Sequence, residues 1–279
     1  MEKKIESLRN SIKSNPNLSE EFKCNLGTLT DTMVTVFPEY DYSNYESVLS
    51  TLSIKNDSSL DSYSSYNKEE NVLSLNTSKV FEDRIDLQHL FLNNLIKMGS
   101  GMNNVNPELN GFVIGLTEVI SSTMNSDESM KKLNVLESTG MRLFSKIVSP
   151  ETLLNAYMTG DMGSVVVELE GLGIEKDEFT KLLNGFNNLQ GSGFSNLECL
   201  VTNMFGKVVD SKLKNGVITE EEIREEYEDF SDMLIHSKSE LISMYPHHDF
   251  SSLNEFENVK KTLDEVIVNT ENKEIAFVK

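Results

Sequence analysis

Few side chains in this 279-residue chain are suited to metal or nucleophilic chemistry, since it has only four histidines and two cysteines. Cys24 and Cys199 lie far apart in the sequence and make no metal-binding spacing, which indicates two separate thiols in a reducing compartment. His247, His248 and Asp249 could form a surface metal site, but adjacent histidines on a loop are more often solvated. No serine stands in a G-x-S-x-G turn, and no glycine-rich phosphate loop occurs.

Two neighbouring segments carry the most informative polar residues. DLQHLFLNNLIKMGSG begins at Asp86, and NGFVIGLTEVISST begins at Asn110. Residues four apart on a helix share one face, which is how an H-E-x-x-H helix brings two imidazoles to one zinc ion. His89 precedes Asn93 by one turn and is expected to be a partly buried helix residue.

The layout of these segments resembles a set of uncharacterised bacterial gluzincin-like metallopeptidase-type proteins. In that set the first helix reads like H-E-L-x-H-x-x-S, and the second, which supplies the third zinc ligand, reads like N-E-G-x-T-E-Y. The resemblance covers the chain from Tyr63 to Leu189 and includes a later Y-M-T-G-D segment that starts at Tyr157.

The resemblance implies five positions of a former site. Asn93 and Lys97 stand where the two histidines would be, Asn94 replaces the glutamate, Ile114 replaces the third ligand, and Glu118 follows one turn later as a supporting acid. An amide, an ammonium group and a hydrocarbon are poor zinc ligands. The expectation is a pseudo-peptidase with no catalytic residue, metal or cofactor. If the scaffold is zincin-like, Lys97 and Glu118 could form an ion pair where metal and histidine would be.

The charge balance bears on the kind of partner. The chain has 45 acidic and 25 basic residues and a net charge of −20, so it repels nucleic-acid phosphates and anionic lipid headgroups. The first ten residues lack the apolar stretch of a signal peptide, and no apolar run is long enough to span a bilayer. We expect a cytoplasmic protein with a protein partner, no nucleic acid and no membrane.

Helix signals dominate the sequence pattern. Ser19 is a predicted N-cap, Pro150 a predicted first helical residue, and NVLSLN from Asn71 a predicted hairpin strand. Two capping boxes predict further helix starts, one at Ser195 with Glu198 and one at Thr219 with Glu222. Apolar spacing predicts an amphipathic C-terminal helix over Leu253 to Val266.

These patterns predict a mainly α-helical protein with one small β-hairpin, and the resemblance implies a zincin-like centre. The predicted divisions are an N-terminal helical segment over residues 1–60, a degenerate zincin-like core over 61–190 and a C-terminal helical segment over 194–279. The predicted function is non-catalytic protein binding on an inactive peptidase-like scaffold. Two alternatives stay open: an unrelated all-α acidic interaction protein, such as a phage- or plasmid-borne factor acting on a host system, and an enzyme with an unrecognised site.

Overall fold

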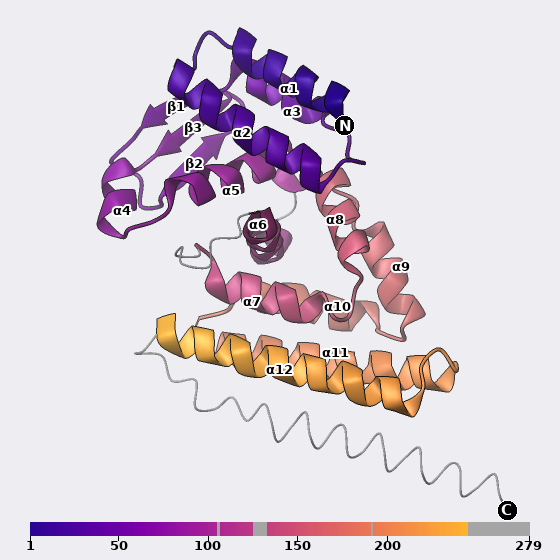
Figure 1. The fold of residues 1–279 in the computed structure, drawn as a ribbon. Helices are drawn as coiled ribbons and strands as arrows, with labels where there is room; N and C mark the ends of the chain where they lie inside the picture. The colour runs from indigo at the N-terminus through magenta and orange to yellow at the C-terminus, as the bar shows by residue number, and fades with distance from the viewer. Residues whose placement is uncertain (105–106, 125–132, 191, 245–279) are drawn as a thin grey trace, which may run out of the picture. The chain divides into compact units, whose positions relative to one another are not determined.

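The computed structural model describes residues 1–104, 107–124, 133–190 and 192–244, and its elements are labelled in Figure 1. Within these residues it has twelve α-helices and one three-stranded sheet, which confirms the predicted mainly helical class. No described helix combines the length and the apolar character that crossing a membrane requires. The predicted helix over Leu253 to Val266 lies outside the described residues, as does His247-His248-Asp249.

The chain divides into two compact units. Unit 1 comprises residues 1–105, 117–134 and 157–160, and unit 2 comprises residues 106–116, 135–156 and 161–279. Two helices are therefore divided between the units: α6 (Asn110–Met124) passes from unit 2 to unit 1 after Leu116, and α8 (Pro150–Thr159) does so after Ala156.

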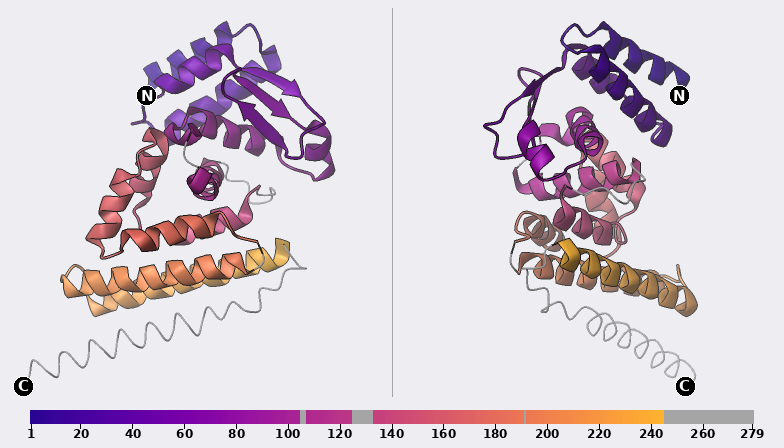
Figure 2. Two further views of the ribbon diagram at one scale, coloured as in Figure 1. Left: turned by 180° about the vertical axis from the view of Figure 1, so that it is seen from behind. Right: turned by 60° about the vertical axis from the view of Figure 1, so that its left-hand side comes forward.

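Unit 1 begins with a group of packed helices, followed by the sheet and the helix that carries the site (Figures 1 and 2). Its elements, besides the divided helices, are α1 (Glu2–Ser14), α2 (Glu20–Val36), α3 (Ser43–Thr51), β1 (Ser53–Asn56), β2 (Ser64–Asn67), β3 (Val72–Leu75), α4 (Thr77–Glu82), α5 (Leu87–Gly99) and the short 3-10 helix η1 (Gly101–Asn104).

The sheet contains the predicted hairpin and one strand more. β3 lies in the centre, antiparallel to β2 and parallel to β1. Asn71 makes the hairpin turn with a positive φ of 52°, a conformation that asparagine tolerates better than most residues. Leu73, Ser74 and Leu75 of the central strand are all buried. The prediction of one hairpin is confirmed, and β1 is the strand it did not include.

Unit 2 is helical throughout its described part. Its elements, besides the divided helices, are η2 (Pro107–Leu109), α7 (Val135–Phe144), α9 (Gly163–Gly171), α10 (Lys176–Phe186), α11 (Gly193–Lys214) and α12 (Glu220–Met244). Aromatic rings hold these helices together: Phe112 meets Phe144 and Phe186 edge-on, and Phe205 of α11 stacks on Phe230 of α12.

Candidate functional site

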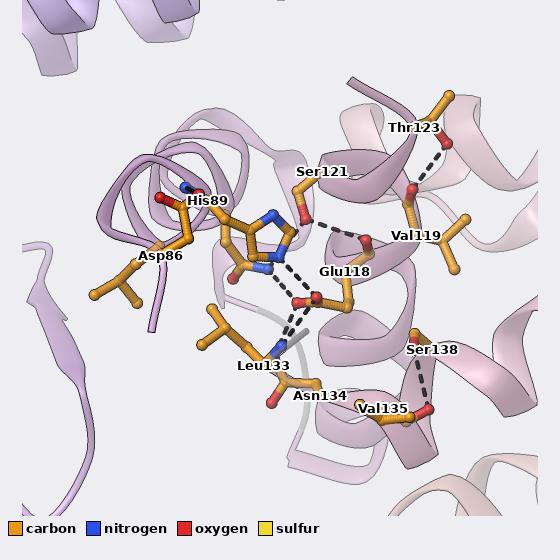
Figure 3. A network of polar contacts seen from close by, with 12 residues as sticks. Asp86, His89, Glu118, Val119, Ser121, Thr123, Leu133, Asn134, Val135 and Ser138 are labelled. Carbon is orange, nitrogen blue, oxygen red and sulfur yellow. Dashed lines mark hydrogen bonds and ion pairs between the residues drawn. The ribbon is translucent and has the colours of Figure 1, made fainter. Parts of the chain in front are cut away.

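Glu118 of α6 is the centre of a buried polar cluster in unit 1 (Figure 3). Its residue exposure is 0%, so its carboxylate depends entirely on protein donors for stabilisation. We call Glu118 with His89, Asn93, Ser121, Leu133 and Asn134 the Glu118 cluster.

Helix α5 supplies two of the donors. The side chain of Asp86 caps this helix by accepting hydrogen bonds from the amides of Gln88 and His89. One turn of helix then separates His89 from Asn93, and both side chains turn toward Glu118. Nε2 of His89 lies 2.7 Å from Oε1 of Glu118, and Nδ2 of Asn93 donates to Oε2 at 2.8 Å.

The segment before α7 supplies the other two donors. The backbone amide of Leu133 donates to Oε1 of Glu118 at 3.2 Å, and Nδ2 of Asn134 donates to Oε2 at 3.4 Å. Ser121 completes the cluster, since its hydroxyl accepts from Asn93 and donates to the backbone carbonyl of Glu118. Because the other three partners of the carboxylate are donors, we assign a proton to Nε2 of His89 as well.

Asn94 and Lys97 do not reach the cluster. Asn94 is buried, and its amide donates to the carbonyl of Leu90 and to the hydroxyl of Ser64 on β2. Lys97 is half-buried, and within the described residues its Nζ has no hydrogen bond or ion pair. Burial lowers the pKa of Lys97, because desolvation penalises its charged form. Ile114 is half-buried in the part of α6 that belongs to unit 2.

The predicted ion pair between Lys97 and Glu118 is wrong. The described structure pairs Glu118 with His89 instead, on the same helix but two turns earlier. Of the five predicted positions, the structure therefore brings Asn93 and Glu118 together, and it adds His89, which the sequence analysis assigned to ordinary burial.

The partners from outside the helix pair had no sequence signal. Leu133 contributes only its backbone amide, and any residue except proline can do so. Asn134 lies 16 residues from Glu118 along the chain, and no periodicity links them.

The cluster as it stands is closed to chemistry that needs a free carboxylate. Both oxygens of Glu118 accept hydrogen bonds, and neither the glutamate nor His89, which is 4% exposed, presents appreciable surface to solvent. In the part of the chain that the structure describes, no three His, Cys, Asp or Glu residues gather closely enough to hold a metal ion. The arrangement can anchor α5 and the Leu133–Asn134 segment to α6.

Comparisons with known proteins add no relative. The chain matches no protein-family model, and no curated protein or solved structure shows a significant similarity to it.

Proposed function

We propose that this chain is a non-catalytic protein that acts by binding another protein, and that the Glu118 cluster maintains its scaffold. The observation that carries the proposal is that Glu118 has no exposed surface and that four protein donors bind its carboxylate. A general base or metal ligand needs a lone pair that can reach water or substrate. Here both carboxylate oxygens of Glu118 accept hydrogen bonds from the chain itself.

The geometry of α5 and α6 supports an inactive peptidase-like scaffold. Two side chains one turn apart on α5 meet an acid on the next long helix. The resemblance implies a similar layout with the third ligand at Ile114, whereas the acid in contact is Glu118, one turn later. The two side chains that contact Glu118 are those of His89 and Asn93. They lie one turn before Asn93 and Lys97, the pair assigned from the sequence. If the chain is instead an unrelated all-α interaction protein, the Glu118 cluster contributes only to stability, and the proposed binding of another protein still holds.

The proposal is tested first on chemistry. Full-length protein is purified without a histidine tag, its metal content is measured, and hydrolysis of a broad fluorogenic peptide library is followed with and without added zinc. We expect no stoichiometric metal and no turnover. Zinc-dependent hydrolysis by the wild type that disappears in a folded Glu118→Gln variant would overturn the proposal.

The second test is of binding. The full chain, expressed in its source cells, is cross-linked and recovered under denaturing conditions, and the covalent adducts are identified by mass spectrometry. We expect one abundant protein adduct that is repeatedly recovered and reassembles with the purified chain in solution. Recovery of the chain without any reproducible protein adduct would contradict a binding role.

A further inference from the structure

One face of α12 presents an ordered set of exposed side chains. Positions spaced alternately four and three residues apart form a line along a helix, because two such steps make seven residues, close to two turns. We call the seven exposed residues on this line the α12 stripe: Glu221, Glu225, Glu228, Asp232, Ile235, Ser239 and Ile242.

The opposite face of α12 is already occupied. Tyr227 and Phe230 are buried and pack against Phe205 of α11, and the two helices lie side by side in every view (Figures 1 and 2). The stripe therefore points away from the core of unit 2. Other acids of the helix have partners within the protein: Glu226 pairs with Lys212.

The four acids of the α12 stripe have no such partners in the part of the chain that the structure describes. Among the described residues no hydrogen bond or ion pair neutralises their side chains, although Asp229 beside them pairs with Lys146. The line therefore begins with four acids that form no ion pair within the described residues, and it ends with two β-branched aliphatic side chains. Ile235 is 47% exposed and Ile242 is 48% exposed, seven residues apart on the same side of the helix.

We propose that the α12 stripe is a docking surface for a helix of a partner protein that is cationic along one half and aliphatic along the other. The inference rests on the proposed binding function and names the partner's chemistry. Lysine or arginine side chains would pair with the acidic half, and aliphatic side chains would cover Ile235 and Ile242.

The charge pattern argues against other occupants. A second copy of the chain would bring a net charge of −20 and an identical acidic line, and nucleic acid or an anionic membrane would be repelled in the same way.

Two synthetic helical peptides of about three heptads serve as probes. Their stripe-facing positions carry leucine in one half and lysine in the other, and the two peptides differ in the order of the halves because the docking direction is not assigned. A third peptide has the same composition with lysine and leucine interspersed. We expect one of the ordered peptides to bind the full-length chain at least about tenfold more tightly than the interspersed peptide does.

Variants of the stripe separate the two halves of the interaction. Ile235→Ser with Ile242→Ser, and separately Glu225→Lys with Glu228→Lys, should each weaken binding of the ordered peptide about tenfold or more. The charge variant should also flatten the decline of affinity with added salt. Matched controls should change affinity by less than about twofold: Val167→Ser, at a residue 69% exposed on α9, and Glu39→Lys with Glu170→Lys.

A photo-reactive benzoylphenylalanine in place of Ile235 locates the contact. Cross-linking to the ordered peptide supports the inference. Cross-linking to residues 245–279 of the same chain while the peptide stays unbound would overturn it, as would equal binding of ordered and interspersed peptides. If the chain shows no hydrolysis and binds neither ordered peptide, the docking role of the α12 stripe is contradicted, while protein binding at another surface is not. Metal-dependent hydrolysis would instead remove the proposed function.

Discussion

At the scale of single residues, substitutions in the Glu118 cluster should cost the most folding stability. A buried carboxylate that loses its donors, or donors that lose their carboxylate, keep their desolvation cost without the compensating hydrogen bonds. Four donors converge on Glu118 from α5 and from the segment before α7. Its side chain therefore joins parts of unit 1 that are distant in sequence.

Glu118→Ala should lower the free energy of unfolding by roughly 3–5 kcal/mol, because it leaves the buried His89 and three half-buried donors without their acceptor. Glu118→Gln keeps the shape and one acceptor oxygen, so a smaller loss of about 1–3 kcal/mol is expected. Urea unfolding followed by circular dichroism measures both. Glu39→Ala, at an exposed loop position, is the control and should change stability by less than about 0.5 kcal/mol. Equal unfolding midpoints for the Glu118→Ala variant and the wild type would show that the cluster does not support the fold.

Asn93→His should create a zinc site in the Glu118 cluster. It places a second imidazole one turn after His89, and both would face the carboxylate of Glu118, which gives two nitrogen ligands and one oxygen ligand. Zinc in thousandfold excess over its dissociation constant would add about 4 kcal/mol of stability. Thermal melting with and without zinc measures this. Asn94→His is the control, because Asn94 faces Ser64 on β2 and should give no zinc-dependent shift.

Lys97→Met should stabilise the protein, because it removes a half-buried charge that has no partner among the described residues. Burial lowers the pKa of Lys97 in the folded state, so the unfolded chain holds the proton more tightly and the charge reduces stability at neutral pH. That loss disappears as the pH rises through the folded-state pKa. The variant should melt on the order of 2 °C higher at neutral pH, and its advantage should shrink toward about pH 10. Lys13→Met, at an exposed position of α1, should show no such pH-dependent difference.

The sequence could locate the candidate site only to within a helical turn. Polar side chains at helical spacing identified both helices, and the contact between Asn93 and Glu118 lies between them. The position along α5 is harder to predict, because residues separated by one turn share a face and the pattern repeats itself. The sequence pattern alone therefore does not distinguish His89 from Lys97 as the partner of Glu118. That the five positions descend from a zinc site stays a prediction.

At the scale of elements, local signals were reliable where side chains cap the backbone. Ser19 caps α2, Pro150 begins α8, and Thr219 with Glu222 forms the predicted capping box before α12. The box at Ser195 is wrong, because α11 already begins at Gly193 and Ser195 lies inside it. β1 had no signal, since its four residues, SIKN, are mostly polar and its pairing with β3 is long-range.

Two glycines in unit 1 should respond to alanine in opposite directions. A Cβ at Gly99 of α5 would overlap the ring of Tyr45, which is buried and whose hydroxyl donates to the carbonyl of Ile96. Gly99→Ala should therefore cost about 1–3 kcal/mol through overpacking. At Gly27 of α2 nothing lies within 4 Å of the added Cβ, so Gly27→Ala should gain about 0.5–1 kcal/mol from helix propensity. Chemical unfolding of both variants tests this, and a stabilised Gly99→Ala would mean that α3 and α5 do not pack as described.

At the scale of the whole molecule, the surplus of acid is the dominant property. A net charge of −20 opposes every compact state by self-repulsion, whichever fold the chain adopts. The ion pairs that salt would weaken, such as that between Lys207 and Glu178, are partly exposed and contribute little individually. Repulsion should therefore outweigh attraction in the response to salt.

Raising NaCl from about 0.01 M to 0.2 M should increase the melting temperature. The screening length falls from about 30 Å to below 10 Å, which weakens the repulsion between the surplus negative charges. Glu225→Lys with Glu228→Lys adds two charges at each position and brings the net charge from −20 to −16, so its melting temperature should rise less over the same series. Differential scanning calorimetry at constant pH measures both slopes. Choline chloride at the same ionic strength is the control for specific sodium binding. A melting temperature that falls with salt would show that attractive pairs outweigh the surplus charge, and it would weaken the case for a cationic partner on α12.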